Sequence, residues 1–140
     1  MSVFTVDADV FISAFLPAEP HHASSLKCLT RLRASGDTLA CPRLLIVEVA
    51  SALIRNTGDR DGARDFALSL VSLSGMRLFS LDDDLCELAV QAAVDSQLRG
   101  ADAVYVAVAL QQRATLVTWD RQMLTRAAAL VSTTTPQTVI

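Results

Sequence analysis

Four carboxylate side chains occupy places where this chain is otherwise apolar or turning. Asp7 follows the apolar run at residues 3–6, and Asp120 ends the run Thr-Leu-Val-Thr-Trp-Asp. Glu48 lies within Leu-Leu-Ile-Val-Glu-Val-Ala-Ser, and Asp102 lies within Gly-Ala-Asp-Ala-Val-Tyr. Charged groups at half-buried positions are costly unless a partner compensates them, and no Lys or Arg lies within four residues of Glu48. A divalent cation is a partner that several carboxylates can share, so the pattern indicates a site for Mg²⁺ or Mn²⁺.

Each carboxylate also has a structural explanation, and these alternatives stay open at the level of sequence. Asp120 stands between a predicted strand and a predicted helix, which is the place of an N-cap residue. Asp102 would interact favourably with the positive end of its helix dipole, and Asp9 would cap a helix that starts at Val10. Glu48 lies in the middle of a helix and has no capping role, so an Arg from elsewhere in the fold is its structural alternative.

Length, composition and charge restrict the class of protein. A chain of 140 residues fits one domain, residues 1–140, with a sizeable core. The hydrophobic content of 51% and the mean hydropathy of +0.38 are high for so small a chain, which favours an oligomer with part of its apolar surface covered. The net charge of −3 argues against non-specific attraction to polyanions. A nucleic-acid site would therefore need a local Arg patch around bound metal.

Cysteine usage and the N-terminus predict a cytoplasmic protein without a membrane anchor. Cys28, Cys41 and Cys86 form no CxxC pair and are odd in number, so we expect buried, reduced thiols. No basic region precedes the N-terminal apolar stretch, which Asp7 and Asp9 interrupt, so no signal peptide is expected. Charged residues break the longest apolar runs well short of the roughly 20 residues that a membrane helix needs.

Short β-rich runs alternate with longer helical patterns, which is typical of a parallel sheet with helices on both faces. The sequence therefore predicts an α/β fold, a three-layer α/β/α sandwich with a central parallel sheet of four to five strands. Predicted strands cover residues 3–6, 38–41, 76–80 and 115–119, with an edge strand in the Thr-rich tail before Pro136. Predicted helices cover residues 10–16, 23–34, 42–57, 61–73, 82–98, 101–113 and 121–130.

The predicted sheet should bring the carboxylates together. Asp7 and Asp120 directly follow strands, and ligands of open α/β sheets bind beyond the carboxyl ends of the strands. Glu48 lies in the helix after the second strand, and Asp102 lies in the first turn of the helix that leads to the fourth. We therefore expect all four side chains to converge at this edge of the sheet.

Taken together and in order, these residues resemble the PIN-domain family of metal-dependent ribonucleases, in particular the short toxins of VapBC toxin–antitoxin pairs. Four motifs carry the resemblance: Val6-Asp7-Ala8-Asp9-Val10, residues 42–55 with Glu48 in Leu-Ile-Val-Glu-Val-Ala-Ser-Ala-Leu, Ala101-Asp102-Ala103-Val104-Tyr105-Val106-Ala107, and Leu116-Val117-Thr118-Trp119-Asp120. Each motif alone is weak. The four in this order are specific, and they span nearly the whole chain.

The resemblance implies a PIN-like fold, Mg²⁺- or Mn²⁺-dependent endoribonuclease activity, a homodimer, and inhibition by a small antitoxin whose segment fills the active-site groove. It implies that the catalytic metal ligands or water-positioning groups are Asp7, Glu48, Asp102 and Asp120. It further implies that Asp9 and Thr118 orient those groups. Because lysine is nearly absent, the candidates for contacts with RNA phosphates or the partner are Arg43, Arg55, Arg99, Arg113 and Arg121.

Two other functions fit part of the pattern. The run Asp-Ala-Asp-Val at residues 7–10 also matches the nucleophile motif of haloacid-dehalogenase-like phosphatases, with Asp7 as nucleophile and Asp82-Asp83 as the distal acidic pair. That assignment needs a phosphate-binding Lys before the distal pair, whereas the sole lysine, Lys27, comes too early. The other alternative is a PIN-like scaffold that binds RNA or a partner without cutting. The complete acidic set argues against it.

Overall fold

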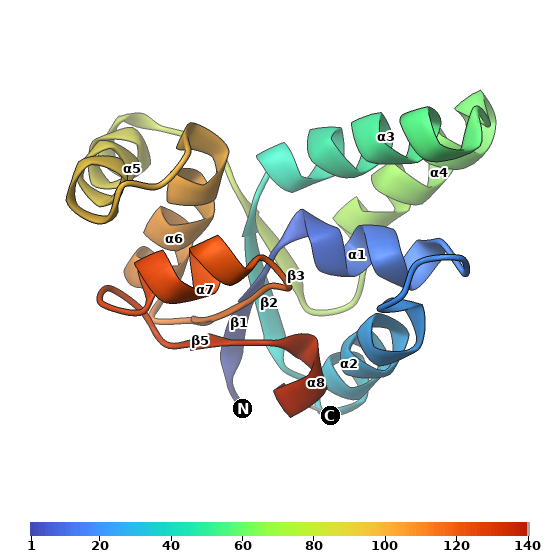
Figure 1. Cartoon of the computed structure of the whole chain (residues 1–140), viewed down its shortest axis with the longest axis horizontal. Helices are drawn as coiled ribbons and strands as arrows, with labels where there is room; N and C mark the ends of the chain where they lie inside the picture. Colours follow the sequence, from blue (N-terminus) through green and yellow to red (C-terminus); the bar gives the residue numbers. More distant parts are fainter. Residues whose placement is uncertain (140) are drawn as a thin grey trace.

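The computed structural model of the chain describes residues 1–139 and shows a five-stranded sheet between two layers of helices (Figure 1). The strands are β1 (Val3–Val6), β2 (Thr38–Pro42), β3 (Met76–Phe79), β4 (Thr115–Val117) and β5 (Thr133–Thr134). All are parallel, in the spatial order β3-β2-β1-β4-β5. The predicted α/β/α sandwich is confirmed, and β5 is the edge strand expected in the Thr-rich tail.

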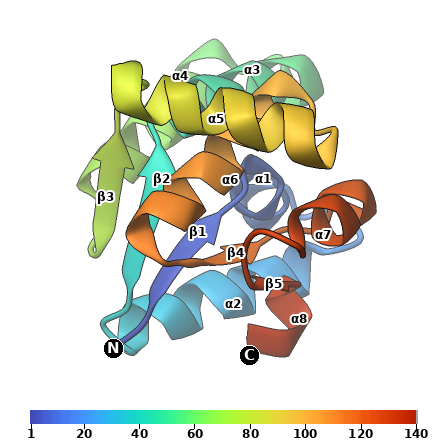
Figure 2. The same ribbon diagram turned by 90° about the vertical axis from the view of Figure 1, so that its left-hand side faces the viewer.

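Helices cover both faces of the sheet, with α1–α4 on one face and α5–α7 on the other (Figures 1 and 2). Their bounds are α1 (Ala8–Phe15), α2 (His22–Ala34), α3 (Leu44–Thr57), α4 (Arg60–Ser69), α5 (Asp83–Ser96), α6 (Gly100–Gln112) and α7 (Arg121–Ala127). A 3₁₀ turn (Leu70–Ser72) follows α4, and a short α8 (Pro136–Val139) packs against α2. Right-handed connections between parallel strands explain the two layers. From β1 to β3 the chain moves across the sheet in one direction, whereas from β3 through β4 to β5 it moves in the opposite direction. The helices of these two stretches therefore lie on opposite faces of the sheet.

The direction of the connections reverses between β1 and β4, which is where an open α/β sheet forms a crevice. The two strands end at the same level, since Val6 pairs with Val117. Just beyond them, the Asp7 backbone N–H donates to the Val117 carbonyl at 2.9 Å. Asp7 and Thr118 therefore lie next to each other at the carboxyl edge of the sheet.

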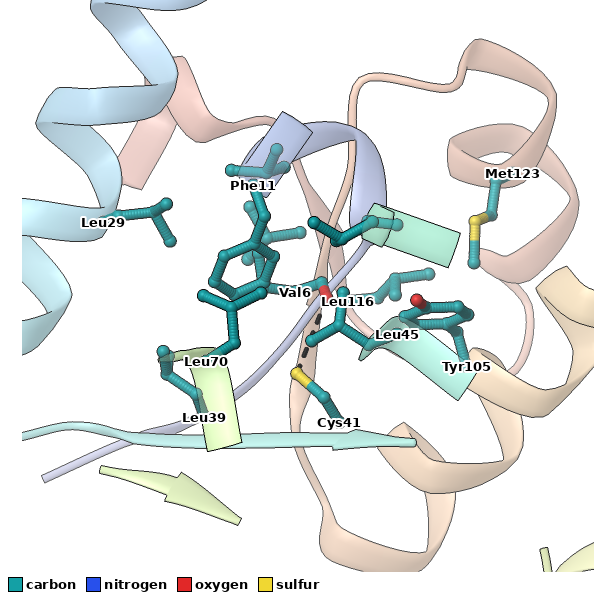
Figure 3. Packing of buried hydrophobic residues seen from close by; sticks show 14 of the residues in the cluster. Val6, Phe11, Leu29, Leu39, Cys41, Leu45, Leu70, Tyr105, Leu116 and Met123 are labelled. Carbon is teal, nitrogen blue, oxygen red and sulfur yellow. Dashed lines mark hydrogen bonds between the residues drawn. The ribbon is translucent and has the colours of Figure 1, made fainter. Parts of the chain in front are cut away.

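A large cluster of buried side chains joins the sheet to both helix layers (Figure 3). Cys28 and Cys41 belong to this cluster, as predicted for reduced thiols. The prediction of a buried thiol is wrong for Cys86, which is exposed. The helical repeat of α5 turns its neighbour Leu85 inward and leaves Cys86 on the outer surface. Within residues 1–139, no helix is both long and apolar enough to cross a membrane.

Two helix starts, those of α1 and α3, differ by two residues from the sequence-based prediction, for local reasons. Helix α1 begins at Ala8, because the Asp7 side chain accepts the Ala8 N–H at 2.8 Å and caps the helix. The interpretation of Asp9 as the cap is therefore wrong, and Asp9 lies inside the first turn. Pro42 was expected in a helical first turn but ends β2, and the ladder continues from Arg43, whose N–H donates to the Phe79 carbonyl at 3.0 Å.

Candidate functional site

A cavity of about 500 Å³ opens at the carboxyl edge of the sheet, beyond the ends of β1 and β4. Five carboxylates line it: Asp7, Asp9, Glu48, Asp102 and Asp120. Asp7 and Asp120 are the N-caps of α1 and α7, and the others project from the first turns of α1 and α6 and from the second turn of α3. The structure thus brings the four carboxylates expected to converge, together with Asp9, to one cavity. Asp7 and Asp120 therefore each cap a helix and also line the cavity.

The Thr118 hydroxyl connects the buried carboxylate of Asp7 with the half-buried carboxylate of Asp9. It donates to Asp7 Oδ2 at 2.7 Å, lies 3.2 Å from Asp9 Oδ2, and accepts the Asp120 backbone N–H at 3.0 Å. Asp9 Oδ2 also accepts the Trp119 backbone N–H at 3.1 Å. Asp9 Oδ1 is buried without a hydrogen-bond partner among the described residues. An unpaired buried carboxylate oxygen is costly, so this atom is suited to a ligand in the cavity.

Burial raises the pKa of both neighbouring carboxyls, Asp7 and Asp9, above the usual value for an aspartate. It raises the pKa of Asp7 to about 8, with the negative charge of Asp9 as the next cause. Burial also raises the pKa of Asp9 to about 6, although hydrogen bonds from Trp119 and Thr118 oppose this. Because the two groups are close, they titrate as a pair and together carry less than two negative charges near neutral pH.

Glu48 is held by a tyrosine and not by an arginine. The Tyr105 hydroxyl donates to Glu48 Oε1 at 2.7 Å. Arg55, on the same helix as Glu48, donates to Ser51 at 2.6 Å instead. None of the ion pairs within residues 1–139 includes Glu48. The alternative explanation for Glu48, an ion pair with an Arg from elsewhere in the fold, is therefore wrong for this part of the chain. Burial raises the pKa of the Glu48 carboxyl, and the hydrogen bond from Tyr105 opposes that shift.

Arg99 bridges the two remaining carboxylates. Its Nε donates to Asp102 Oδ2 at 3.2 Å, and its Nη2 donates to Asp120 Oδ2 at 3.1 Å. The Arg99 side chain is 71% exposed, so water screens both pairs and each contributes little to stability. The sequence-based interpretation gives Arg99 as a candidate for contacts with RNA or a partner and does not include these ion pairs. The spacing of three residues between Arg99 and Asp102 on one helix was a readable signal for one of these pairs.

The five candidate arginines are not brought together. Arg55 and Arg99 line the cavity, whereas Arg43 and Arg121 are exposed outside it. Arg113 directly follows the last residue of α6 and so lies at the opposite end of this helix from Asp102. At 1.5 Å per residue this places it roughly 16 Å along the helix axis from Asp102. Any contact of Arg113 with RNA or a partner would lie outside this cavity.

The donor chemistry of the cavity fits a hard divalent cation. Carboxylate oxygens are the ligands that Mg²⁺ and Mn²⁺ prefer, and the unpaired, buried Asp9 Oδ1 is one such atom. Within residues 1–139, no three acidic, histidine or cysteine side chains are already close enough to hold one ion. Arg99 pairs with one oxygen of Asp102 and one of Asp120, so an ion that used these two oxygens would have to displace this exposed side chain.

The raised carboxyl pKa values predict how the stability of the metal-free protein depends on pH. Between pH 4 and pH 8 the folded protein keeps a proton on Asp7 that the unfolded chain has released, so this group lowers the free energy of unfolding as the pH rises. Asp7→Asn should therefore become progressively more stable than the wild type across this window, by up to about 1.4 kcal/mol per pH unit. Urea unfolding at several pH values measures the difference. A difference that stays constant across this pH range would contradict the raised pKa of Asp7.

The fold has counterparts among solved crystal structures. VapBC2 from Rickettsia felis, bound to a fragment of its promoter DNA, has a TM-score of 0.72 and 14% identity, covering 95% of this chain and 98% of the matched chain. VapC20 from Mycobacterium tuberculosis, a toxin that cleaves the sarcin–ricin loop, has a TM-score of 0.73 and 22% identity, covering 93% and 97%. FitAcB from Neisseria gonorrhoeae has a TM-score of 0.73 and 18% identity, covering 97% and 98%. At these identities the likeness shows a shared fold.

Sequence comparison gives the family. No curated protein matches the sequence significantly. The sequence model of the PIN domain does match, over residues 4–130. This span runs from β1 to the end of α7 and includes all the carboxylates that line the cavity. Since the match extends over most of the 140 residues, the chain belongs to the PIN-domain family.

Proposed function

We propose that the protein is a metal-dependent endoribonuclease and the toxin of a type II toxin–antitoxin pair. The observation that carries the proposal is the set of five carboxylates around one cavity at the β1–β4 crevice. Membership of the PIN-domain family supports it, as does the shared fold with VapC20, itself a toxin that cleaves the sarcin–ricin loop. The phosphatase alternative has no comparable support, because its required lysine is absent from the cavity and the sole Lys27 lies on α2.

In this proposal the ion is held by Asp7, Glu48, Asp102 and Asp120. When bound, Mg²⁺ or Mn²⁺ supplies a nucleophilic water near neutral pH and neutralises charge on the phosphate. The Thr118 hydroxyl fixes the orientation of Asp7 through the 2.7 Å hydrogen bond to Oδ2. Asp9 stands beside it as a further oxygen donor or as a support for Asp7. These contacts hold the site in shape before RNA arrives.

In this proposal, two arginines bind the RNA backbone. Arg55 and Arg99 line the cavity together with the carboxylates. The exposed guanidinium of Arg99 neutralises Asp102 and Asp120 in the ion-free protein. With an ion bound by these carboxylates, Arg99 would be available to bind a phosphate, for which its planar guanidinium group is well suited.

An antitoxin and a second copy of the chain complete the proposal. An apolar groove of about 560 Å³ runs between α3 and α4 and shares Val47 and Ser51 with the acidic cavity. An amphipathic segment of a small partner would cover this groove and reach the carboxylates. For the homodimer, the supporting observation is exposed apolar surface on α5, where Val90 and Val94 are 59% and 70% exposed.

Expression in a bacterial host tests the proposed function. We expect induced wild-type protein to arrest growth, and Asp7→Ala to remove the arrest at equal protein level. Coexpression of any small reading frame that neighbours the gene should also relieve the arrest, if it encodes the antitoxin that occupies the cavity. Equal arrest by the wild type and Asp7→Ala would show that toxicity does not depend on the carboxylates.

A further inference from the structure

One side-chain hydrogen bond joins the two helix layers at Glu48, which lines the acidic cavity. Glu48 projects from α3, on one face of the sheet, and Tyr105 projects from α6, on the other (Figure 1). The bond from the Tyr105 hydroxyl to Glu48 Oε1 is 2.7 Å long and connects residues 57 positions apart in the sequence. We propose that Tyr105 is a positioning residue, which holds one oxygen of Glu48 and leaves the other to bind the ion. This inference rests on the proposed metal-dependent function.

Tyr105 is suited to this role because it is itself immobile. Only 1% of its surface is exposed, and its ring belongs to the main hydrophobic cluster together with Leu45 and Met123 (Figure 3). A phenol is protonated at neutral pH, so its hydroxyl is available as a donor to the carboxylate. The hydroxyl therefore stands at a point that core packing determines.

Glu48 depends on a side-chain hydrogen bond for its orientation more than Asp7 and Asp120 do. A glutamate side chain has more rotatable bonds than an aspartate and loses more freedom when it is ordered. Asp7 and Asp120 are held by backbone N–H groups at the starts of α1 and α7. Within the described part of the chain, the Glu48 carboxylate accepts one hydrogen bond, from the Tyr105 hydroxyl.

Helix α6 thus acts on the proposed ion site in two ways. Its first turn carries Asp102, a candidate ligand, and its second turn carries Tyr105, three residues later and on the same side. Helix α6 would therefore set the distance between Asp102, from its own layer, and Glu48, from the opposite layer.

Removing only the hydroxyl tests the inference. Tyr105→Phe keeps the ring in the core, and we expect its affinity for Mn²⁺, measured by calorimetry, to fall roughly tenfold, the effect typical of a group that orients a ligand. In cleavage assays at a fixed, subsaturating Mn²⁺ concentration, kcat should fall while KM for RNA stays unchanged. The matched control repeats the substitution in a Glu48→Ala background. There it should have no further effect on Mn²⁺ affinity, because the group it orients is gone.

Each result decides one question. Unchanged Mn²⁺ affinity in Tyr105→Phe overturns the inference, and so does a wild type that binds no Mn²⁺. An equal loss with and without Glu48 also overturns it, because Tyr105 would then act through packing alone. Urea unfolding of each variant establishes that the affinities compare folded proteins. If the wild type binds Mn²⁺ but cleaves no RNA, the nuclease proposal fails, while the Mn²⁺ affinities still decide the role of Tyr105.

Discussion

Asp102→Asn is expected to reduce RNA cleavage by the purified protein about a hundredfold or more and to leave the fold intact. Asp102 lines the cavity from the first turn of α6, and Asn has the same shape. The substitution removes one negative oxygen ligand from the proposed ion site. An ion contributes several kcal/mol to the stabilisation of developing charge, and each 1.4 kcal/mol corresponds to about a factor of ten in rate. Initial rates on a fluorescent RNA measure the loss.

Two controls separate chemistry from binding and folding. Asp84→Asn removes an exposed carboxylate from α5, outside the cavity, and should cleave like the wild type. Asp102→Asn should bind RNA as well as the wild type or better, because the substitution removes negative charge near the phosphates. Cleavage by Asp102→Asn at the wild-type rate, in preparations free of contaminating nuclease, would remove Asp102 from the site.

Glu48→Gln is expected to change metal-free and metal-bound stability differently. Without metal, the variant should be as stable as the wild type or more stable, since burial and Asp102 already disfavour the charge of Glu48 in the folded state. With Mn²⁺ at a hundredfold excess over the dissociation constant, the wild type gains about 2.7 kcal/mol. A tenfold weaker site would gain about 1.4 kcal/mol at the same concentration. Thermal unfolding with and without Mn²⁺ measures both quantities.

The exposed Glu87→Gln on α5 is the matched control for this prediction and should keep the full Mn²⁺-induced shift. A Glu48→Gln variant that is clearly less stable without metal, yet also keeps the full shift, would identify Glu48 as a structural residue. Its hydrogen bond to Tyr105 would then serve the packing of α3 against α6.

Much of the fold was predictable because local hydrophobic patterns encode it. Apolar runs such as residues 3–6 and 115–117 form the predicted parallel strands, and helices cover both faces. The start of α1 was not predictable in the same way. Asp7 and Asp9 are equally acceptable cap types, and only the backbone conformation, extended at Asp7, selects between them. Pro42 presented a similar choice between the end of a strand and the start of a helix.

The carboxylates of the candidate site could be predicted from the sequence because each one is a charged residue in an apolar or turn-forming stretch. Apart from the Arg99–Asp102 pair, three residues apart on one helix, their partners could not be predicted from local patterns. Tyr105 is 57 residues from Glu48, and Arg99 is 21 residues from Asp120, so only the folded chain shows these pairs. Thr118 could be connected with Asp7, 111 residues away, only through the resemblance to a family.

Whether the acidic cavity cleaves RNA with the help of a divalent ion is decided by one measurement. The purified chain is stripped of metal with a chelator, and cleavage of a labelled RNA is followed as Mg²⁺ or Mn²⁺ is added back. We expect no cleavage before addition, recovery with either ion, and no recovery in Asp102→Asn. Full cleavage by the stripped wild type, matched by stripped Asp102→Asn, would contradict a metal-dependent site built from these carboxylates.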